Sequence, residues 1–207
     1  MAPGESQQPE LLVDFIVSLD GYAAADDWPG LWGLGGPGYF AWLEQLPENA
    51  NNILMGATTY RLMSGFAAES EEAFAEMTAR PKIVFSSTLE EPLSWSNSRL
   101  VAGDAVEEVR SLKENGDVSF STVGSLSLCR SLLKAGLVDR LRLVVFPVIT
   151  GRSGRERIYD DYPDVSLKLV NSQTLDGRLQ LLEYVPTVLT EPPGSDAPMV
   201  SPVEDAT

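Results

Sequence analysis

The feature that most constrains this chain is the alternation of short apolar runs with segments of helical periodicity. The apolar runs are rich in branched side chains, which is typical of buried strands, and the segments between them carry leucine or aromatic residues at helical spacing. Strands that alternate with helices predict a largely parallel sheet with helices on both faces. The expected strands are residues 11–17, 53–56, 82–86, 119–123, 141–148, 167–171 and 179–185, and the expected helices are 39–46, a segment from Thr58 onward, 71–79, 105–115 and 125–135.

The C-terminal part departs from this alternation, because its last two strands follow each other directly. Leu175-Asp176-Gly177-Arg178 separates them, and Asp-Gly between apolar runs is typical of a hairpin turn. We therefore expect one α/β domain over residues 11–186, whose mostly parallel sheet ends in an antiparallel edge hairpin. Residues 1–10 are predicted to be a disordered N-terminus, and residues 187–207 a disordered tail rich in proline and acidic residues.

Two features of the composition narrow the chemistry that this chain could perform. It contains no histidine, which excludes Ser-His and Cys-His nucleophile pairs and every histidine-ligated metal site, and we predict no metal. The single cysteine, Cys129, lies among leucines at helical spacing, so we expect a packed thiol rather than a nucleophile.

Charge and hydropathy bear on the partners of the chain. The formal net charge of -15 would repel nucleic acid, although a few local donors could still hold a small anionic cofactor. No apolar run approaches the roughly 20 residues of a membrane span, and the start of the chain lacks the pattern of a signal peptide. We therefore expect a cytoplasmic protein whose partner is a small molecule.

Two strand-to-helix turns are candidates for binding a phosphate group. In the first, Gly56 lets the backbone approach a ligand, and Thr58 or Thr59 offers a hydroxyl group. In the second, Gly124 and Ser125 follow the strand at residues 119–123 in the same way. In such sheets, ligands gather at the carboxyl ends of the strands, where helix N-termini point outward. The alternative is that each is a tight turn before a capped helix, and this reading is preferred for either turn alone.

Two further segments are candidates, of which the first is a weak signal and the second is more distinctive. Ser86 and Ser87 follow the strand at residues 82–86 and offer hydroxyl and amide donors, although such residues are common in loops. Residues 151–157 place three arginines and two glycines in a short span of a very acidic chain. These arginines could bind an anionic group, or they could pair with nearby acids such as Asp160 and Asp161; both interpretations stay open.

The candidates for proton transfer are the carboxylates that follow the first strand. Asp20 lies in a Leu-Asp-Gly turn, where aspartate commonly binds its own backbone, and Asp27 lies beside Trp28. If Trp28 forms an apolar wall, it would favour the protonated form of Asp27. Asp27 is therefore the first candidate for the proton donor, and Asp20 is the second.

Together these segments resemble the dihydrofolate reductase superfamily and, within it, the reductase domain of riboflavin biosynthesis (the RibD C-terminal domain). Residues 17–21 resemble its Ser-Leu-Asp-Gly motif, and residues 54–60 resemble its glycine-to-threonine cofactor turn. Residues 122–125 match the glycine pair that contacts the pyrophosphate, with Ser125 in place of the second glycine. The most specific likeness is residues 136–143 with the following Pro147 and Gly151, and the resemblance spans about residues 11–185.

The resemblance implies a dihydrofolate reductase-like, three-layer fold with NADPH lying across the strand ends, and it implies a homodimer. Hydride would pass to a C=N or C=O bond of a small heterocyclic substrate, of the pterin or ribosylamino-pyrimidine type. Ala57 stands where many relatives have arginine. The implied cofactor contacts are Gly56, Thr58 and Thr59 at the phosphates, Ser86 and Ser87 at the adenosine ribose or its 2′-phosphate, and Gly124, Ser125 and Leu126 at the pyrophosphate.

A second function remains open at this point. The chain could be a non-catalytic protein that keeps the fold and a ligand but has lost the reaction. The two functions differ in whether a carboxylate faces the nicotinamide pocket, and the sequence does not place one there.

Overall fold

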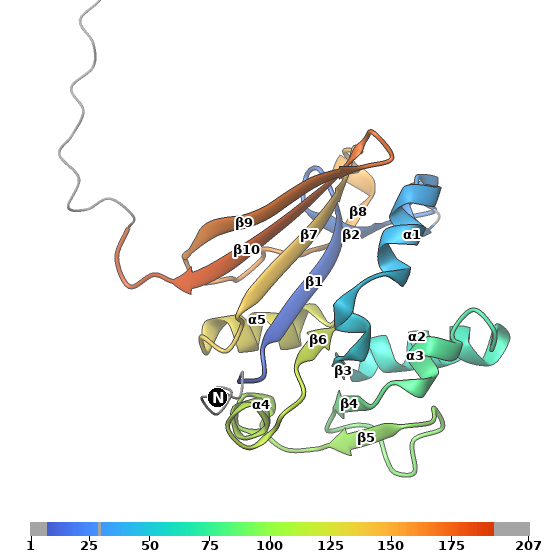
Figure 1. Ribbon diagram of the computed structural model, residues 1–207, viewed down its shortest axis with the longest axis vertical. Coiled ribbons are helices and arrows are strands. Elements are labelled where there is room, and N and C mark those ends of the chain that lie inside the picture. The colour runs from blue at the N-terminus through green and yellow to red at the C-terminus, as the bar shows by residue number, and fades with distance from the viewer. Residues whose placement is uncertain (1–7, 29, 193–207) are drawn as a thin grey trace, which may run out of the picture.

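One eight-stranded sheet organises the protein, as the computed structural model shows for residues 8–28 and 30–192 (Figure 1). Its strand order is β5-β4-β3-β6-β1-β7-β10-β9; the first six strands are parallel and the last two form an antiparallel hairpin. The predicted sheet with its edge hairpin is therefore confirmed. The strands are β1 (Leu11–Ser18), β2 (Tyr22–Ala25), β3 (Asn52–Gly56), β4 (Lys82–Phe85), β5 (Ser98–Val101), β6 (Phe120–Thr122), β7 (Arg140–Phe146), β8 (Gly154–Arg157), β9 (Val165–Leu175) and β10 (Leu179–Val188).

Helices cover both faces of this sheet, because successive side chains of a strand point to opposite sides. On one face, Val13 and Phe15 of β1 pack in the same apolar cluster as Leu132 of α5 and Val109 of α4. On the other face, α1 and α2 each cover a separate apolar cluster. The helices are α1 (Pro37–Glu44), α2 (Ala57–Glu69), α3 (Ala75–Ala79), α4 (Ala105–Asn115) and α5 (Leu126–Lys134), with short 3-10 turns η1 (Gly30–Gly33), η2 (Pro47–Ala50) and η3 (Gly151–Ser153).

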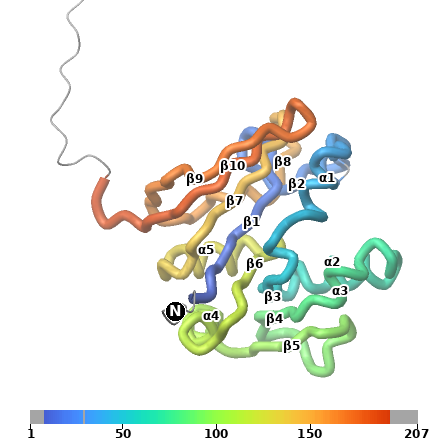
Figure 2. Tube along the Cα trace, in the orientation of Figure 1, coloured from blue at the N-terminus to red at the C-terminus, as the bar shows by residue number. Residues whose placement is uncertain are grey.

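Three strands lie outside the sequence prediction. β5 extends the parallel edge beyond β4, and β2 pairs with β8 in a separate two-stranded sheet. Figure 2 shows that β2 and β8 lie together near one end of β1, while β5 and the β9–β10 hairpin mark opposite edges of the large sheet. All three strands are short and polar or alanine-rich, so they carry no apolar run that periodicity could detect.

The domain limits also differ slightly from the expected ones. β10 continues to Val188, beyond the expected limit at residue 186, and the Leu189 amide donates to the Asp164 carbonyl. At the other end, the Glu10 amide donates to Ser119 Oγ at 3.0 Å, although residues 1–10 are expected to be disordered. The expected helix at residues 71–79 is shorter, since α3 begins at Ala75. Most of the predicted N-terminus and tail lies outside the described residues.

The β9–β10 hairpin holds α1 in place through one carboxylate. Asp176 and Gly177 both have positive φ angles, as the tight turn predicted at Asp-Gly requires. The Asp176 carboxylate accepts hydrogen bonds from the Gly38 amide at 2.7 Å and the Tyr39 amide at 2.9 Å, at the N-terminus of α1. A Cβ atom at Gly36 would lie 2.5 Å from this carboxyl group, so the glycine-rich loop lets the helix reach its capping residue.

Candidate cofactor and active site

The two predicted phosphate-binding turns lie side by side at the carboxyl edge of the sheet. β3 is the neighbour of both β4 and β6, and Gly56 pairs with Phe85 while Leu54 pairs with Thr122. Neighbouring strands are about 4.8 Å apart. Gly56, Ser86 and Gly124 therefore lie at the ends of three adjacent strands, and the structure brings them together.

The hydroxyl group of Ser125 joins the first turn to the second. Ser125 Oγ accepts a hydrogen bond from the Gly56 amide at 2.8 Å. It also lies 2.8 Å from Thr59 Oγ1, to which the Ser125 hydroxyl can donate. Both Gly124 (φ 53°) and Ser125 (φ 65°) adopt the left-handed conformation. Thr58 is exposed at the start of α2, and Leu126 begins α5. Four of the predicted residues thus form one connected cluster, namely Gly56, Thr59, Gly124 and Ser125.

The helix N-termini at these two turns lack side-chain caps of the kind that α1 and α4 have. Neither α2 nor α5 has a side-chain capping hydrogen bond or an acidic residue in its first turn, within the residues that the structure describes. By contrast, the Asp104 carboxylate caps α4 and the Asp176 carboxylate caps α1. Uncapped amide groups and the positive end of the helix dipole favour an anion. In a chain of net charge -15, these two helix ends are open to a negatively charged ligand.

The loop after β4 is built by Ser86. Its Oγ accepts hydrogen bonds from the Thr88 and Leu89 amides, both at 3.0 Å, and it is half-buried. Ser87 and Thr88 are exposed, and Arg61 Nη2 of α2 donates to Thr88 Oγ1 at 3.2 Å. Ser86 therefore shapes the loop, while the groups that face solvent are Ser87, Thr88 and Arg61. Arg61 was not among the residues predicted from the sequence.

Asp20 lies at the end of β1 and ties it to the loop after β7. Its carboxylate accepts hydrogen bonds from Ser18 Oγ at 2.7 Å, the Gly151 amide at 2.8 Å and the Thr150 amide at 3.2 Å. Desolvation opposes ionisation, but these hydrogen bonds outweigh it and lower the pKa of Asp20 to about 2. At neutral pH this carboxylate holds no proton to donate, and its contacts are those of a structural residue.

Asp27 follows β2 and has a positive φ angle of 59°. Its side chain is exposed, and the neighbouring Trp28 is 43% exposed. The apolar wall expected beside Asp27 is therefore not formed by Trp28. Trp32 is instead a core residue, because it is buried against Phe146 with ring centroids 5.2 Å apart.

The arginine-rich segment of residues 151–157 forms η3 and β8. Arg155 makes an ion pair with Asp26, and Arg157 lies over the ring of Tyr22 with its Cζ atom 6.0 Å from the centroid. Asp161 pairs with Arg130 of α5 rather than with an arginine of this segment. The expected pairing with an acidic residue is therefore found for Arg155, but its partner is Asp26 rather than Asp160 or Asp161.

Cys129 has the packed position that the sequence predicts. Its side chain is buried in α5, and its Sγ lies 3.3 Å from the Gly124 carbonyl. Desolvation raises the pKa of this thiol to about 12, so the nucleophilic thiolate does not form near neutral pH.

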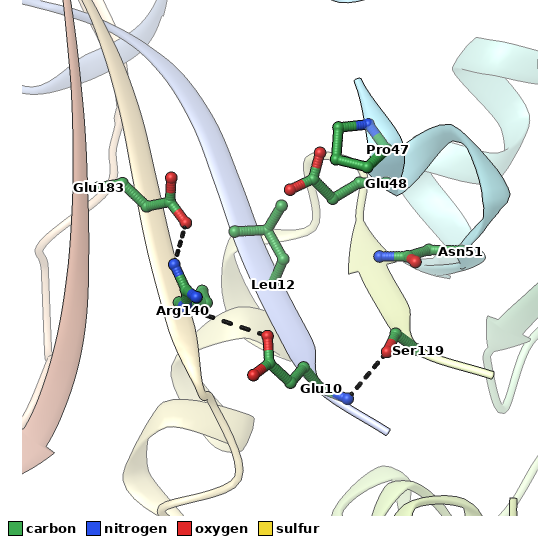
Figure 3. Close-up of a pocket in the computed structure, with 8 residues that line it drawn as sticks. All are labelled: Glu10, Leu12, Pro47, Glu48, Asn51, Ser119, Arg140 and Glu183. Atoms are coloured by element: carbon green, nitrogen blue, oxygen red, sulfur yellow. Dashed lines mark hydrogen bonds and ion pairs between the residues drawn. The ribbon is translucent and has the colours of Figure 1, made fainter. Parts of the chain in front are cut away.

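A hollow of about 170 Å³ lies at the opposite edge of the sheet, at the amino ends of β1, β6 and β7. Figure 3 shows Arg140 there between Glu10 and Glu183, with Ser119 and Asn51 across the hollow. The charged groups of this hollow pair with each other, because Arg140 forms ion pairs with both Glu10 and Glu183. The helix N-termini described above lie at the other edge of the sheet. We therefore place the candidate active site at the carboxyl edge.

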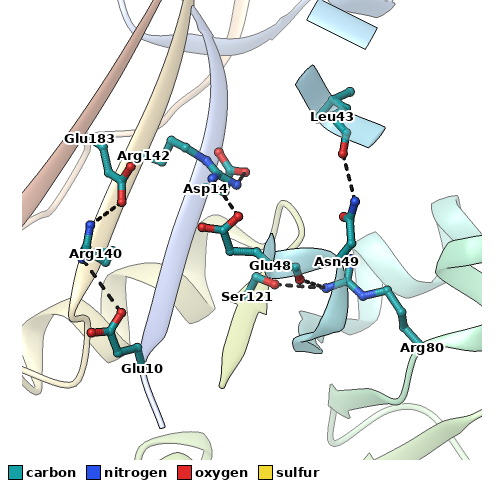
Figure 4. A network of polar contacts seen from close by, with 10 residues as sticks. All are labelled: Glu10, Asp14, Leu43, Glu48, Asn49, Arg80, Ser121, Arg140, Arg142 and Glu183. Atoms are coloured by element: carbon teal, nitrogen blue, oxygen red, sulfur yellow. Dashed lines mark hydrogen bonds and ion pairs between the residues drawn. The ribbon is translucent and has the colours of Figure 1, made fainter. Parts of the chain in front are cut away.

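Beside this hollow, a buried arginine links β1 and β7 to η2 (Figure 4). Arg142 Nη2 donates to Asp14 Oδ2 at 2.7 Å, its Nη1 lies 3.4 Å from Glu48 Oε2, and its guanidinium lies over the ring of Trp42. Burial raises the pKa of Asp14, and the charge of Arg142 opposes this shift. The network fixes the segment that leads into β3, and its sequence signal is an aspartate within an apolar strand.

The strand order and the helices on both faces of the sheet define a dihydrofolate reductase-like α/β fold. The chain belongs to the RibD C-terminal domain family, whose sequence profile matches residues 9–181. It is 27% identical over 187 residues to the uncharacterized protein YyaP of Bacillus subtilis (strain 168), across 86% of this chain and 95% of that protein.

Solved structures share the fold. A putative riboflavin biosynthesis protein from Shewanella sp. PV-4 superposes with a TM-score of 0.64 at 21% identity, covering 86% of this chain and 99% of that one. A pyrimidine reductase-like protein from Corynebacterium diphtheriae gives a TM-score of 0.61 at 18% identity, covering 86% and 92%. A Thermotoga maritima diaminohydroxyphosphoribosylaminopyrimidine deaminase/5-amino-6-(5-phosphoribosylamino)uracil reductase gives 0.57 at 18% identity, covering 87% of this chain and 57% of that one.

Proposed function

We propose that the protein is an NADPH-dependent reductase of a small heterocyclic substrate of the pterin or ribosylamino-pyrimidine type. The observation that carries this proposal is the pair of uncapped helix N-termini, α2 and α5, at adjacent strand ends with no acidic residue in their first turns. A pyrophosphate group suits such a site because the free amides and the helix dipoles both favour its negative charge. The RibD family membership supports the same reading.

The residues of the two turns would hold the cofactor. The left-handed backbone at Gly124 and Ser125 turns the amides at the start of α5 toward the ligand, and such a concave set of amides binds anions. Gly56 and Thr59 line the neighbouring turn, and the hydroxyl of Thr58 is exposed beside them. When bound, NADPH would supply the hydride, and the protein would supply orientation and electrostatics.

Reduction of a C=N bond also requires a proton at nitrogen. Asp20 is already an acceptor of several hydrogen bonds, so we assign it the structural role of joining β1 to the loop after β7. We propose that Asp27, whose side chain is exposed, or a water molecule delivers the proton.

A second candidate function is a non-catalytic protein that binds the dinucleotide. It is favoured by the state of the two candidate acids, since Asp20 is engaged by the backbone and Asp27 is exposed. Turnover with any substrate of the proposed class would decide between the two functions.

Cofactor binding is tested by titrating the protein with NADPH and measuring quenching of tryptophan fluorescence and energy transfer to the nicotinamide. We expect saturable binding, followed by turnover in a screen of dihydrofolate and riboflavin precursors. No binding of NADPH or NADH at millimolar concentration would contradict the proposal.

Gly124→Val tests whether the backbone at this turn contacts the cofactor. A Cβ atom there would lie 3.0 Å from Thr59 Oγ1, and the φ angle is 53°, so a side chain must disturb the turn. We expect NADPH affinity to fall at least tenfold, or about 1.4 kcal/mol. Gly136→Val is the matched control, because Gly136 ends the same helix with φ 68° in open space. Equal affinities in the two folded variants would refute the contact.

We further propose a cytoplasmic location, small molecules rather than nucleic acid or membranes as partners, and a homodimer. None of the described helices is long and apolar enough to cross a membrane. Light scattering would measure the oligomeric state directly.

A further inference from the structure

We propose that Asp176 and Arg178, in the turn of the β9–β10 hairpin, are positioning residues that hold α1 and the loop of residues 30–36 as one wall of the substrate site. This inference rests on the proposed function, because it concerns the strand ends where reduction would take place. Neither side chain would contact the substrate. Each would act through the backbone that it holds.

The hairpin turn binds the backbone of this region at three points. The Asp176 carboxylate accepts hydrogen bonds from the Gly38 and Tyr39 amides at 2.7 and 2.9 Å. Arg178 Nη2 donates to the Leu34 carbonyl at 2.9 Å. Figure 1 shows the β9–β10 turn, the β2–β8 pair and α1 at the same end of the molecule. The turn therefore joins the last two strands of the sheet to the loop and the helix that follow β2.

The loop needs such a hold because its backbone is strained. Leu31 (φ 54°) and Trp32 (φ 48°) are consecutive non-glycine residues in the left-handed conformation. This conformation is unfavourable for L-residues and persists where the surrounding structure enforces it. The Leu34 amide donates to the Leu31 carbonyl at 2.8 Å, and the Leu34 carbonyl accepts from Arg178. Leu34 thus connects the strained turn to the hairpin.

Glycine lets the carboxylate approach the loop. A Cβ atom at Gly36 would lie 2.5 Å from the carboxyl carbon of Asp176. The φ angle of Gly36 is -122°, which any residue can adopt, so only the contact with Asp176 excludes a side chain there. A Cβ atom at Gly30, in the same loop, would meet no atom within 4 Å. The two glycines therefore provide a matched pair of substitutions.

The loop and α1 pack against the ends of β1 and β7. The rings of Trp32 and Tyr39 lie on Phe146, with centroids 5.2 and 5.8 Å away. Phe146 is the last residue of β7 and pairs with Ser18, the last residue of β1. Ser18 Oγ in turn donates to the Asp20 carboxylate at 2.7 Å. Displacement of the loop or of α1 would therefore disturb these two strand ends.

These strand ends adjoin the proposed cofactor site. Gly124 follows β6, and β1 and β7 are the next two strands of the sheet, about 4.8 Å apart. Asp27, the proposed proton donor, follows β2, which comes directly after β1 in the chain. With the pyrophosphate at Gly124, the reacting end of the cofactor and the substrate would lie at the ends of β1 and β7, beside the loop and α1.

The test compares Arg178→Ala, Arg178→Lys and Gly36→Ala with wild type and the control Gly30→Ala, as full-length proteins shown by urea unfolding to be folded. The measurements are amide hydrogen exchange, the dissociation constant of NADPH, and kcat and KM for the substrate found in the screen of dihydrofolate and riboflavin precursors. Arg178→Ala should speed exchange of the Leu34 amide about tenfold, and Gly36→Ala that of the Gly38 and Tyr39 amides, because each variant loses the hydrogen bonds of the hairpin turn.

Both variants should also raise KM about tenfold, equivalent to about 1.4 kcal/mol, and leave NADPH affinity unchanged. A purely structural role would lower stability without raising KM in the folded protein. Arg178→Lys should restore part of the wild-type KM, because an ammonium group can also donate to the Leu34 carbonyl. Gly30→Ala should match wild type in every measurement.

The outcomes separate this inference from the proposed function. Unchanged exchange in Arg178→Ala and Gly36→Ala would show that the hairpin does not hold the loop. Faster exchange with an unchanged KM, or an equal loss of NADPH affinity, would show that the loop is not a wall of the substrate site. Each of these results overturns the inference and leaves the proposed reductase unaffected. If wild type reduces no substrate in the screen, the proposed function fails and this inference fails with it.

Discussion

Replacement of Ser125 by alanine and by glycine should destabilise the protein by different amounts. Ser125 has φ 65° and ψ 57°, a left-handed conformation that costs an L-residue roughly 1–2 kcal/mol and costs glycine almost nothing. Its Oγ accepts from the Gly56 amide and donates to either Thr59 Oγ1 or the Val123 carbonyl, since a hydroxyl has one proton. Both replacements remove these hydrogen bonds, but only glycine relieves the backbone.

The magnitudes follow from these contacts. Two hydrogen bonds at about 1 kcal/mol each give a loss of about 2 kcal/mol for Ser125→Ala. Glycine recovers roughly 1–2 kcal/mol of backbone strain and loses roughly 0.5–1 kcal/mol through its more flexible unfolded state. Ser125→Gly should therefore cost about 1 kcal/mol.

Urea unfolding followed by circular dichroism measures both free energies of unfolding under the same conditions. The expected order of stability is wild type, then Ser125→Gly, then Ser125→Ala. If the alanine variant is as stable as the glycine variant, the left-handed conformation of residue 125 does not lower the free energy of unfolding. If both match wild type, the Ser125 hydrogen bonds between the two turns contribute nothing.

Three further predictions concern the carboxylates. The pKa of Asp20 in the folded protein is about 2, against an ordinary value of 3.8, so the stabilisation by its carboxylate is present above pH 3.8 and is lost as the pH falls toward 2. The difference in unfolding free energy between wild type and Asp20→Asn, measured by urea unfolding, should therefore disappear over that pH range. Asp176→Ala should lower the free energy of unfolding by about 0.5–2 kcal/mol, because it removes the cap of α1. Asp176→Asn should lower it less, because asparagine keeps an acceptor and tolerates the φ angle of 51°. Equal stability of Asp176→Ala and wild type would show that this cap contributes nothing. Asp27→Asn should lower turnover with little change in NADPH affinity, and full turnover from pH 5 to 8 would place the proton donor elsewhere.

The order of strands and helices could be predicted from the sequence wherever burial leaves a periodic pattern. β1, β3, β4 and β7 are largely apolar runs because parallel strands are covered on both faces, and α4 and α5 carry an apolar stripe on one side. The hairpin could be predicted because Asp176-Gly177 suits positive φ angles. The strands that escaped prediction, β2, β5 and β8, lie at edges or outside the large sheet, where little apolar surface is buried and polar residues suffice.

For the candidate site, the sequence determined which turns carry glycine and hydroxyl residues, and the tertiary structure decided how they are used. Gly56, Thr59, Gly124 and Ser125 meet because β3 and β6 are neighbours, although β6 follows β3 only after two intervening strands in the chain. The contact of Arg61 with Thr88 joins residues that are 27 positions apart in the chain. The carboxylate of Asp176 caps α1 across 137–138 positions. A local pattern reports the preferences of the backbone, but the strand order sets such long-range pairings, and no local pattern specifies that order.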